Sequence, residues 1–116
     1  MEATKKRTET SEQILIDKLT VPPKARQEVI ERMNMNRNLI KKLPGFIKDK
    51  VYEGTDENGN LIFITIAVWE SSDAIKKAKE VVQIQYQAEG FNLQDMLERL
   101  NILFDRGIYK NADTTI

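Results

Sequence analysis

Apolar residues follow two different periods along this chain, and blocks of the two periods alternate. Short runs rich in β-branched and aromatic side chains predict β-strands at residues 13–21, 46–54, 61–69 and 102–110. Longer blocks with apolar residues three and four apart predict helices at residues 24–43, 71–89 and 92–101. The resulting order is strand, helix, strand, strand, helix, short helix and strand, which is a split βαβ arrangement.

Proline, glycine and serine mark the predicted element boundaries. Pro22-Pro23 suits the start of the first helix, where the missing N–H groups would be unpaired anyway. Pro44-Gly45 ends that helix. Asn58-Gly59 predicts a hairpin because both residues tolerate a positive φ. Ser71 or Ser72 caps the second helix, and Gly90 lies just past its end.

The strand at residues 61–69 is apolar on both faces, so both faces of the sheet should be covered. The predicted fold is therefore α+β and ferredoxin-like, with a four-stranded antiparallel sheet and its helices on one face. So short a chain has little left to cover the other face, and a large exposed apolar sheet is usually an interface. We expect a homodimer that packs sheet face against sheet face.

The length of 116 residues indicates one domain. Residues 1–12 are charged and nearly free of apolar side chains, which predicts a disordered N-terminal tail. The ferredoxin-like domain is predicted at 13–111, followed by a C-terminal tail at 112–116.

Charge and composition exclude several classes of function. Lysine plus arginine and aspartate plus glutamate both total 18, so no net field favours nucleic acid or a membrane surface. The chain has no cysteine and no histidine, which removes thiolate nucleophiles, zinc-finger sites and Ser-His-Asp triads. No carboxylate cluster has ligand spacing and no glycine-rich loop is present, so we expect no metal and no cofactor. The absence of a signal peptide or a membrane span predicts a cytoplasmic protein.

The apolar stripe of the first helix runs through Val29, Met33 and Ile40, and Asn36 falls within about 40° of its centre. In the second helix the predicted stripe is Ala74, Ala78, Val81 and Ala88, and Gln85 lies in its middle. Tyr86 is off the centre and is expected at the rim. Inward-facing amides need partners, because an unpaired buried amide costs about 1 to 3 kcal/mol. Asn36 and Gln85 could bond each other, the backbone, water or a ligand.

Trp69, the only tryptophan, closes the strand at 61–69 and shares a face with Phe63 by alternation. It is either a core side chain that caps the sheet edge or the wall of a site, and the sequence pattern leaves both open.

Three segments in order resemble the antibiotic biosynthesis monooxygenase family: LPGFIKDKVYEG at 43–54, IAVWESSDAIKKA at 66–78 and RGIYKN at 106–111. The resemblance implies a dimeric α/β barrel and places Trp69 in the cleft between sheet and helices. Haem-degrading relatives use a first-strand asparagine and a second-helix histidine, both missing here, so haem degradation is disfavoured. Other relatives oxygenate aromatic or quinol-type substrates without metal or flavin, and many have no known activity.

The resulting expectation is a small-molecule-binding domain that acts as a cofactor-independent monooxygenase on an aromatic or quinol-type metabolite. Trp69 and Arg106 are the candidate catalytic residues, and Arg106 could stabilise an enolate or peroxide anion or pair with a carboxylate such as Asp105. The candidate substrate-binding residues are Asn36, Gln85, Phe63, Tyr52 and Tyr109.

Two other readings stay open. The chain could be a non-catalytic dimeric module that binds a metabolite or has a filled cleft. It could also be an isomerase or dehalogenase, which would need a carboxylate inside the cleft, and the pattern places none there. A further difficulty for any oxygenase is the missing histidine, since the proton must then go to a desolvated carboxylate, lysine or tyrosine.

Overall fold

A computed structural model describes residues 12–113 of the chain. The parts of the two predicted tails at 1–11 and 114–116 lie outside the described residues. The elements along the chain are β1 (Gln13–Val21), the 3-10 helix η1 (Pro23–Ala25), α2 (Arg26–Ile40), β2 (Phe46–Thr55), β3 (Leu61–Trp69), α3 (Ser72–Glu89), α4 (Leu93–Arg99) and β4 (Leu103–Tyr109).

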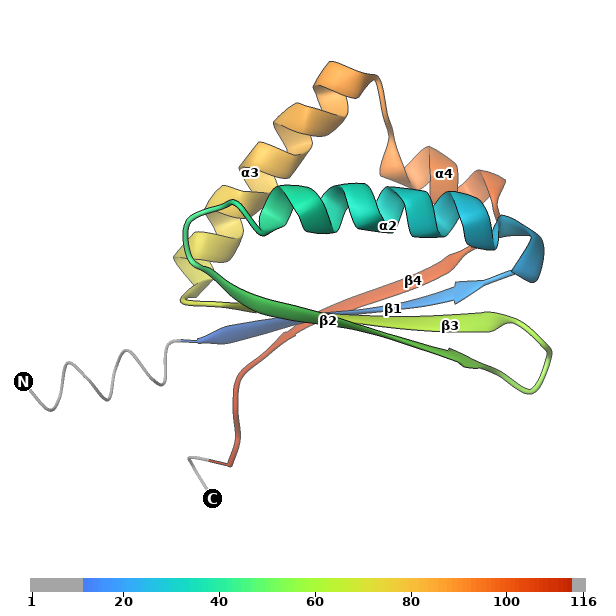
Figure 1. The fold of residues 1–116 in the computed structure, drawn as a ribbon, viewed down its shortest axis with the longest axis horizontal. Helices are drawn as coiled ribbons and strands as arrows, with labels where there is room; N and C mark the ends of the chain where they lie inside the picture. Colours follow the sequence, from blue (N-terminus) through green and yellow to red (C-terminus); the bar gives the residue numbers. More distant parts are fainter. Residues whose placement is uncertain (1–11, 114–116) are drawn as a thin grey trace, which may run out of the picture.

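The strands form a four-stranded sheet in the order β2-β3-β1-β4, and each neighbouring pair is antiparallel. Helices α2, α3 and α4 lie on the same side of this sheet, as Figure 1 shows. This is the ferredoxin-like arrangement, and the predicted fold class is confirmed. No helix within residues 12–113 is both long enough and apolar enough to cross a membrane.

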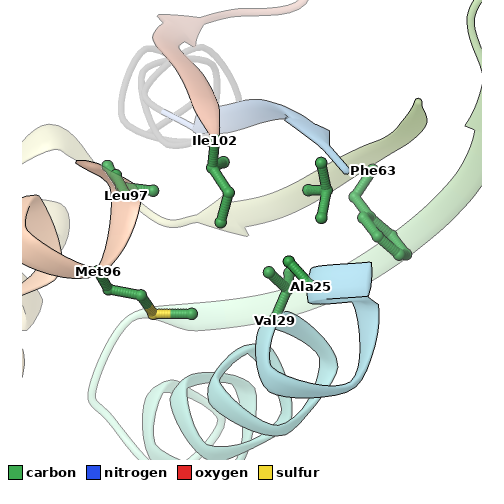
Figure 2. Packing of buried hydrophobic residues seen from close by; sticks show 7 residues of the cluster. Ala25, Val29, Phe63, Met96, Leu97 and Ile102 are labelled. Atoms are coloured by element: carbon green, nitrogen blue, oxygen red, sulfur yellow. The ribbon is translucent and has the colours of Figure 1, made fainter. Parts of the chain in front are cut away.

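The main hydrophobic core lies between the sheet, the start of α2 and α4. Its buried side chains are Val21, Ala25, Val29, Phe63, Met96, Leu97 and Ile102, most of which are labelled in Figure 2. Phe63 points from β3 toward Ala25 and Val29, while Ile102 faces the two side chains of α4. Of the stripe predicted for the first helix, Val29 is buried here and Met33 is partly buried against the same core, and α4 closes the same end of the sheet.

A second, smaller core lies at the other end, where β3 meets α3. It contains Ala67, Trp69, Ile75 and Ala78. From this end α3 rises away from the sheet, so its C-terminal part stands well clear of the strands in Figure 1. The two cores thus pack the two ends of the helical layer against the sheet. Other side chains surround the volume between these cores.

The inward face of α3 differs from the predicted one. Its buried residues are Ile75, Ala78 and Tyr86, so the helix is turned by about one residue relative to a stripe through Ala74 and Gln85. Large side chains gain more than alanines on burial. The helix therefore buries Ile75 and Tyr86 and leaves Gln85 exposed.

The element boundaries follow the expected signals with one change. The Ser71 hydroxyl accepts a hydrogen bond from the Ala74 N–H at 3.1 Å and caps α3, and Gly90 ends it with φ of 69°. In the hairpin between β2 and β3 only Gly59 has a positive φ, at 82°, while Asn58 does not. The Asp56 carboxylate accepts the backbone N–H groups of Asn58 and Asn60 instead.

Candidate functional site

A cavity of about 630 Å³ lies between the sheet and the helical layer. Its walls come from all four strands of the sheet, from α2, α3 and α4, and from the segment that leads into α4. A volume of this size is within the usual range for small-molecule sites.

Trp69 forms one end of the cavity. Its side chain is 2% exposed and makes an edge-to-face contact with Phe46, with ring centroids 5.5 Å apart. The indole N–H is buried and has no hydrogen-bond partner in the described part of the chain. An unpaired buried donor of this kind costs free energy. The predicted inward orientation of Trp69 is confirmed.

Asn36 and Tyr86 join the two long helices across the cavity. The Asn36 side-chain amide donates to the Tyr86 hydroxyl at 2.7 Å, and Tyr86 is 8% exposed. Burial raises the pKa of the Tyr86 hydroxyl above its ordinary value, so this group stays protonated at neutral pH. The inward orientation predicted for Asn36 is confirmed, whereas the expected rim position of Tyr86 is wrong.

Arg32 holds the Tyr86 end of the cavity together. Its guanidinium lies 3.6 Å from the centroid of the Phe91 ring and 5.6 Å from that of Tyr86. It also pairs with Glu89 at 2.9 Å. One side chain of α2 thereby contacts α3 and the segment that follows it.

Arg106 lines the cavity from β4 and pairs with Asp17 on the neighbouring strand β1. Its Nε and Nη2 atoms donate to the two carboxylate oxygens at 2.7 and 2.8 Å. The hydrogen bond to Asp17 raises the pKa of the Arg106 guanidinium above its ordinary value. The expected partner type is correct, but the carboxylate is Asp17 and not Asp105.

Two carboxylates line the cavity, which the sequence pattern did not place there. Asp17 is held by Arg106, and Asp49 on β2 accepts from Arg37 of α2 at 2.6 Å. Both face the helices by strand register, opposite Thr65 and Ala67 of β3. Each is already ion-paired, so neither is a free base in this arrangement.

Gln85 does not belong to the cavity. Its side chain is exposed and donates to Glu89 at 2.8 Å on the surface of α3. The prediction that it faces inward is wrong because α3 presents Tyr86 to the cavity in its place.

Three other predicted binding residues also lie elsewhere. Phe63 is 1% exposed and fills the main core. Tyr52 and Tyr109 pair with Ile64 and Ile14, which puts them on the face of the sheet opposite the helices, where they are 54% and 52% exposed. The structure therefore brings Trp69, Asn36 and Arg106 to one cavity and leaves out Gln85 and these three aromatic residues.

Within residues 12–113, no group of three or more aspartate, glutamate, cysteine or histidine side chains could hold a metal ion. The polar groups of the cavity are an indole, a phenol, amides, paired carboxylates and guanidinium groups. Such an arrangement can bind and orient an organic ligand through hydrogen bonds and apolar contact.

Fold and cavity together define a ferredoxin-like domain with a cavity between its sheet and its helices. A family model described as antibiotic biosynthesis monooxygenase matches residues 13–86. The chain belongs to this family. A comparison with proteins of curated function finds no significant match.

Solved structures with the same fold include the cofactor-independent oxygenase SnoaB from Streptomyces nogalater in a point-mutant form, at 20% identity and TM-score 0.66, covering 87% of this chain and 93% of that one. A conserved protein from Methanosarcina mazei Go1 matches at 16% identity and TM-score 0.67, covering 90% and 96%. A dimeric ferredoxin-like protein from an uncultured marine organism matches at 6% identity and TM-score 0.66, covering 87% and 95%. At such identities these likenesses show the fold alone.

Tyr86, Asp17 and Asp49 are among the cavity residues that sequence reasoning missed. The helical spacing of Ile75, Val82 and Tyr86 predicts that Tyr86 faces inward. This spacing is as regular as that of the alanines and involves larger side chains. Asp17 carried its signal in alternation, because it shares a face with Leu15 and Leu19 on β1. Its pairing with Arg106 required the β1 to β4 register, which joins positions 89 residues apart.

Proposed function

We propose that this protein is a cofactor-independent monooxygenase that acts on an aromatic or quinol-type metabolite bound between the sheet and the helices. The observation that carries the proposal is the cavity closed at one end by Trp69, whose buried N–H has no partner. Membership of the monooxygenase family supports the same function. Trp69 and Arg106 are the residues we propose to contact the substrate during the reaction.

The chemistry needs no external reductant. A naphthohydroquinone, for example, reacts with O2 to give a hydroxynaphthoquinone and water. One oxygen atom forms the new C–O bond, the other leaves as water, and the quinol supplies all four electrons. The protein would contribute a water-poor site, orientation, and hydrogen bonds to developing negative charge.

The test is O2 uptake in metal-free buffer with a panel of dihydroxyaromatic and quinol substrates, comparing the native protein with Trp69→Phe. We expect uptake by the native protein and a loss of roughly tenfold or more in the variant, because phenylalanine keeps an aromatic ring but removes the N–H. No uptake across the panel would defeat the enzyme proposal. Equal uptake by the variant would remove Trp69 from the mechanism.

We further propose that the protein works as a homodimer through the sheet face opposite the helices. Isoleucine side chains dominate the centre of that face on β1 and β3, at Ile14, Ile16, Ile62, Ile64 and Ile66. Lys18 interrupts this apolar face opposite Ile64, and a large apolar patch of this kind is typical of an interface. The dimeric ferredoxin-like relative by fold supports the proposal.

A non-catalytic ligand-binding module is the second candidate. It is favoured by the ion pairing of both cavity carboxylates, which leaves no free carboxylate to take a proton. Ligand binding without O2 consumption in the same panel would support this candidate.

A further inference from the structure

The end of the cavity remote from Trp69 carries unused hydrogen-bond donors. The Tyr86 oxygen accepts from Asn36, and the hydroxyl hydrogen has no acceptor within the described residues. Arg106 uses two of the five N–H bonds of its guanidinium to donate to Asp17. The remaining N–H bonds make no hydrogen bond to the described residues, and both residues line the same cavity.

Arg106 and Tyr86 line the same cavity, from β4 and from α3. Both are held in place by other side chains. Asp17 fixes the guanidinium through two parallel hydrogen bonds, while Asn36 and the Arg32 guanidinium fix the phenol. Donors that are oriented before the ligand arrives stabilise negative charge most effectively.

The cavity lining as a whole is favourable to an anion. Charged side chains reach the cavity from each wall: Asp17 on β1, Asp49 and Lys50 on β2, Arg106 on β4, Arg32 and Arg37 on α2, and Lys79 on α3. Basic groups therefore outnumber carboxylates among the cavity-lining residues. Arg32 also pairs with Glu89, which does not line the cavity.

Strand register separates the two ends. Asp17, beside Arg106, lies opposite Thr65 on β3, four positions before Trp69. At about 3.3 Å per residue this is roughly 13 Å along the strand. A flat ligand of two or three fused rings would reach from the indole to Tyr86 and Arg106.

We propose that Tyr86 and Arg106 form a two-donor subsite that binds a phenolic oxygen of the substrate in its deprotonated form. The phenol releases its proton to solvent, and the two donors hold the resulting phenolate. The protein then needs no base of its own, since it lowers the pKa of the bound substrate. This inference rests on the proposed function and assigns a role to Tyr86, which it makes a substrate-contacting residue.

The probe is 1-naphthol, whose phenolate absorbs at a longer wavelength than the neutral form. A pH titration under nitrogen with the native protein in excess should give a pKa for bound naphthol about one unit or more below that in water, which is a tenfold stabilisation of the anion. Tyr86→Phe and Arg106→Lys should each return the pKa toward the free value by at least about half a unit, roughly threefold. Tyr109→Phe, which removes a hydroxyl from the opposite sheet face, should leave it unchanged.

Affinity for naphthalene, which cannot accept a hydrogen bond from either donor in this way, checks that the cavity is intact. A variant that keeps naphthalene affinity but loses the pKa shift supports the subsite. If Tyr86→Phe also lowers the affinity for naphthalene, the Arg106→Lys variant is the test of the subsite. Lysine keeps the positive charge opposite Asp17 but lacks the free edge of the guanidinium.

An unshifted pKa in the native protein, no naphthol binding, or a shift that persists in both variants would overturn the subsite. O2 uptake with quinols by a protein that shows no such shift would leave the proposed function standing while this inference fails. A shift without O2 uptake would keep the subsite as a binding feature and defeat the oxygenase.

Discussion

At the residue scale, the properties of the site come from hydrogen-bond donors whose partners are missing or only partly used. Trp69 has a buried N–H with no partner, and Tyr86 accepts from Asn36 while its own hydrogen remains unused. In contrast, the two carboxylates of the cavity are both paired with arginines. We therefore expect the cavity to favour ligands that carry hydrogen-bond acceptors.

Alternation along β3 was enough to predict that Trp69 faces the helices, because a strand offers only two faces and its apolar residues were regular. The phase of α3 was harder to predict. Adjacent residues on a helix differ in direction by about 100°. A stripe predicted through the alanines, instead of through Ile75 and Tyr86, therefore placed Gln85 on the inward face where the structure has Tyr86. The ion pairs depend on register across the sheet, which local sequence does not encode.

Tyr86→Phe should lower stability and remove a pH dependence. The substitution leaves the Asn36 amide without its acceptor, and we expect a loss of about 1 to 3 kcal/mol in unfolding free energy at pH 7. Burial raises the pKa of Tyr86 in the folded state. Its contribution is therefore fully present below the ordinary tyrosine pKa of about 10 and is lost as pH rises through the folded value.

Denaturant unfolding of both proteins between about pH 8 and 11, which brackets the ordinary tyrosine pKa, measures this difference. The gap between native and Tyr86→Phe should narrow as pH rises above about 10. Tyr109→Phe, at an exposed phenol, serves as the control. A gap that stays constant with pH would contradict the assigned burial effect.

At the element scale, the start of α3 is fixed by the turn that precedes β2. Gly45 has φ of 86°, and its carbonyl accepts the Glu70 N–H at 2.8 Å. A Cβ at this position would lie 2.4 Å from the Cβ of Ala74. The Pro-Gly-Phe segment thus brings the end of α2, the end of β3 and the first turn of α3 into contact beside Trp69.

Gly45→Ala should destabilise the protein by at least about 1 to 3 kcal/mol, because it combines a strained φ with a steric overlap. Thermal or denaturant unfolding measures the effect. Gly54→Ala is the matched control, since a Cβ there meets nothing within 4 Å, and it should change stability by less than about 1 kcal/mol. Equal effects of the two substitutions would show that the Gly45 contact is not the cause.

At the scale of the whole molecule, the two faces of the sheet differ in what they carry. The helix-facing side carries the cavity, and the opposite side carries the isoleucines of β1 and β3 together with Tyr52 and Tyr109. The doubly apolar character of β3 was visible in the sequence and led to the expectation of a covering partner. The cavity was not, because it depends on how α2, α3 and α4 pack over the sheet.

The proposed homodimer predicts that sedimentation equilibrium will give twice the mass of the chain for the native protein. Ile64→Lys places a charge at the centre of the outer face and should shift the protein to monomers, since an unpaired charge buried in an interface is costly. Ile84→Lys alters an isoleucine that is exposed on α3 and should leave the dimer intact. A monomeric native protein, or a dimer that survives Ile64→Lys, would contradict the sheet-to-sheet interface.

The most direct test of the proposed oxygenase is mass spectrometry of the product formed from a naphthohydroquinone under ¹⁸O2 in the presence of a metal chelator. We expect the native protein to give a hydroxyquinone that carries one labelled oxygen atom, with the second labelled atom in water. We expect much less labelled product from Trp69→Phe. A quinol that binds in the cavity but gives no labelled hydroxyquinone above the rate without protein would contradict it.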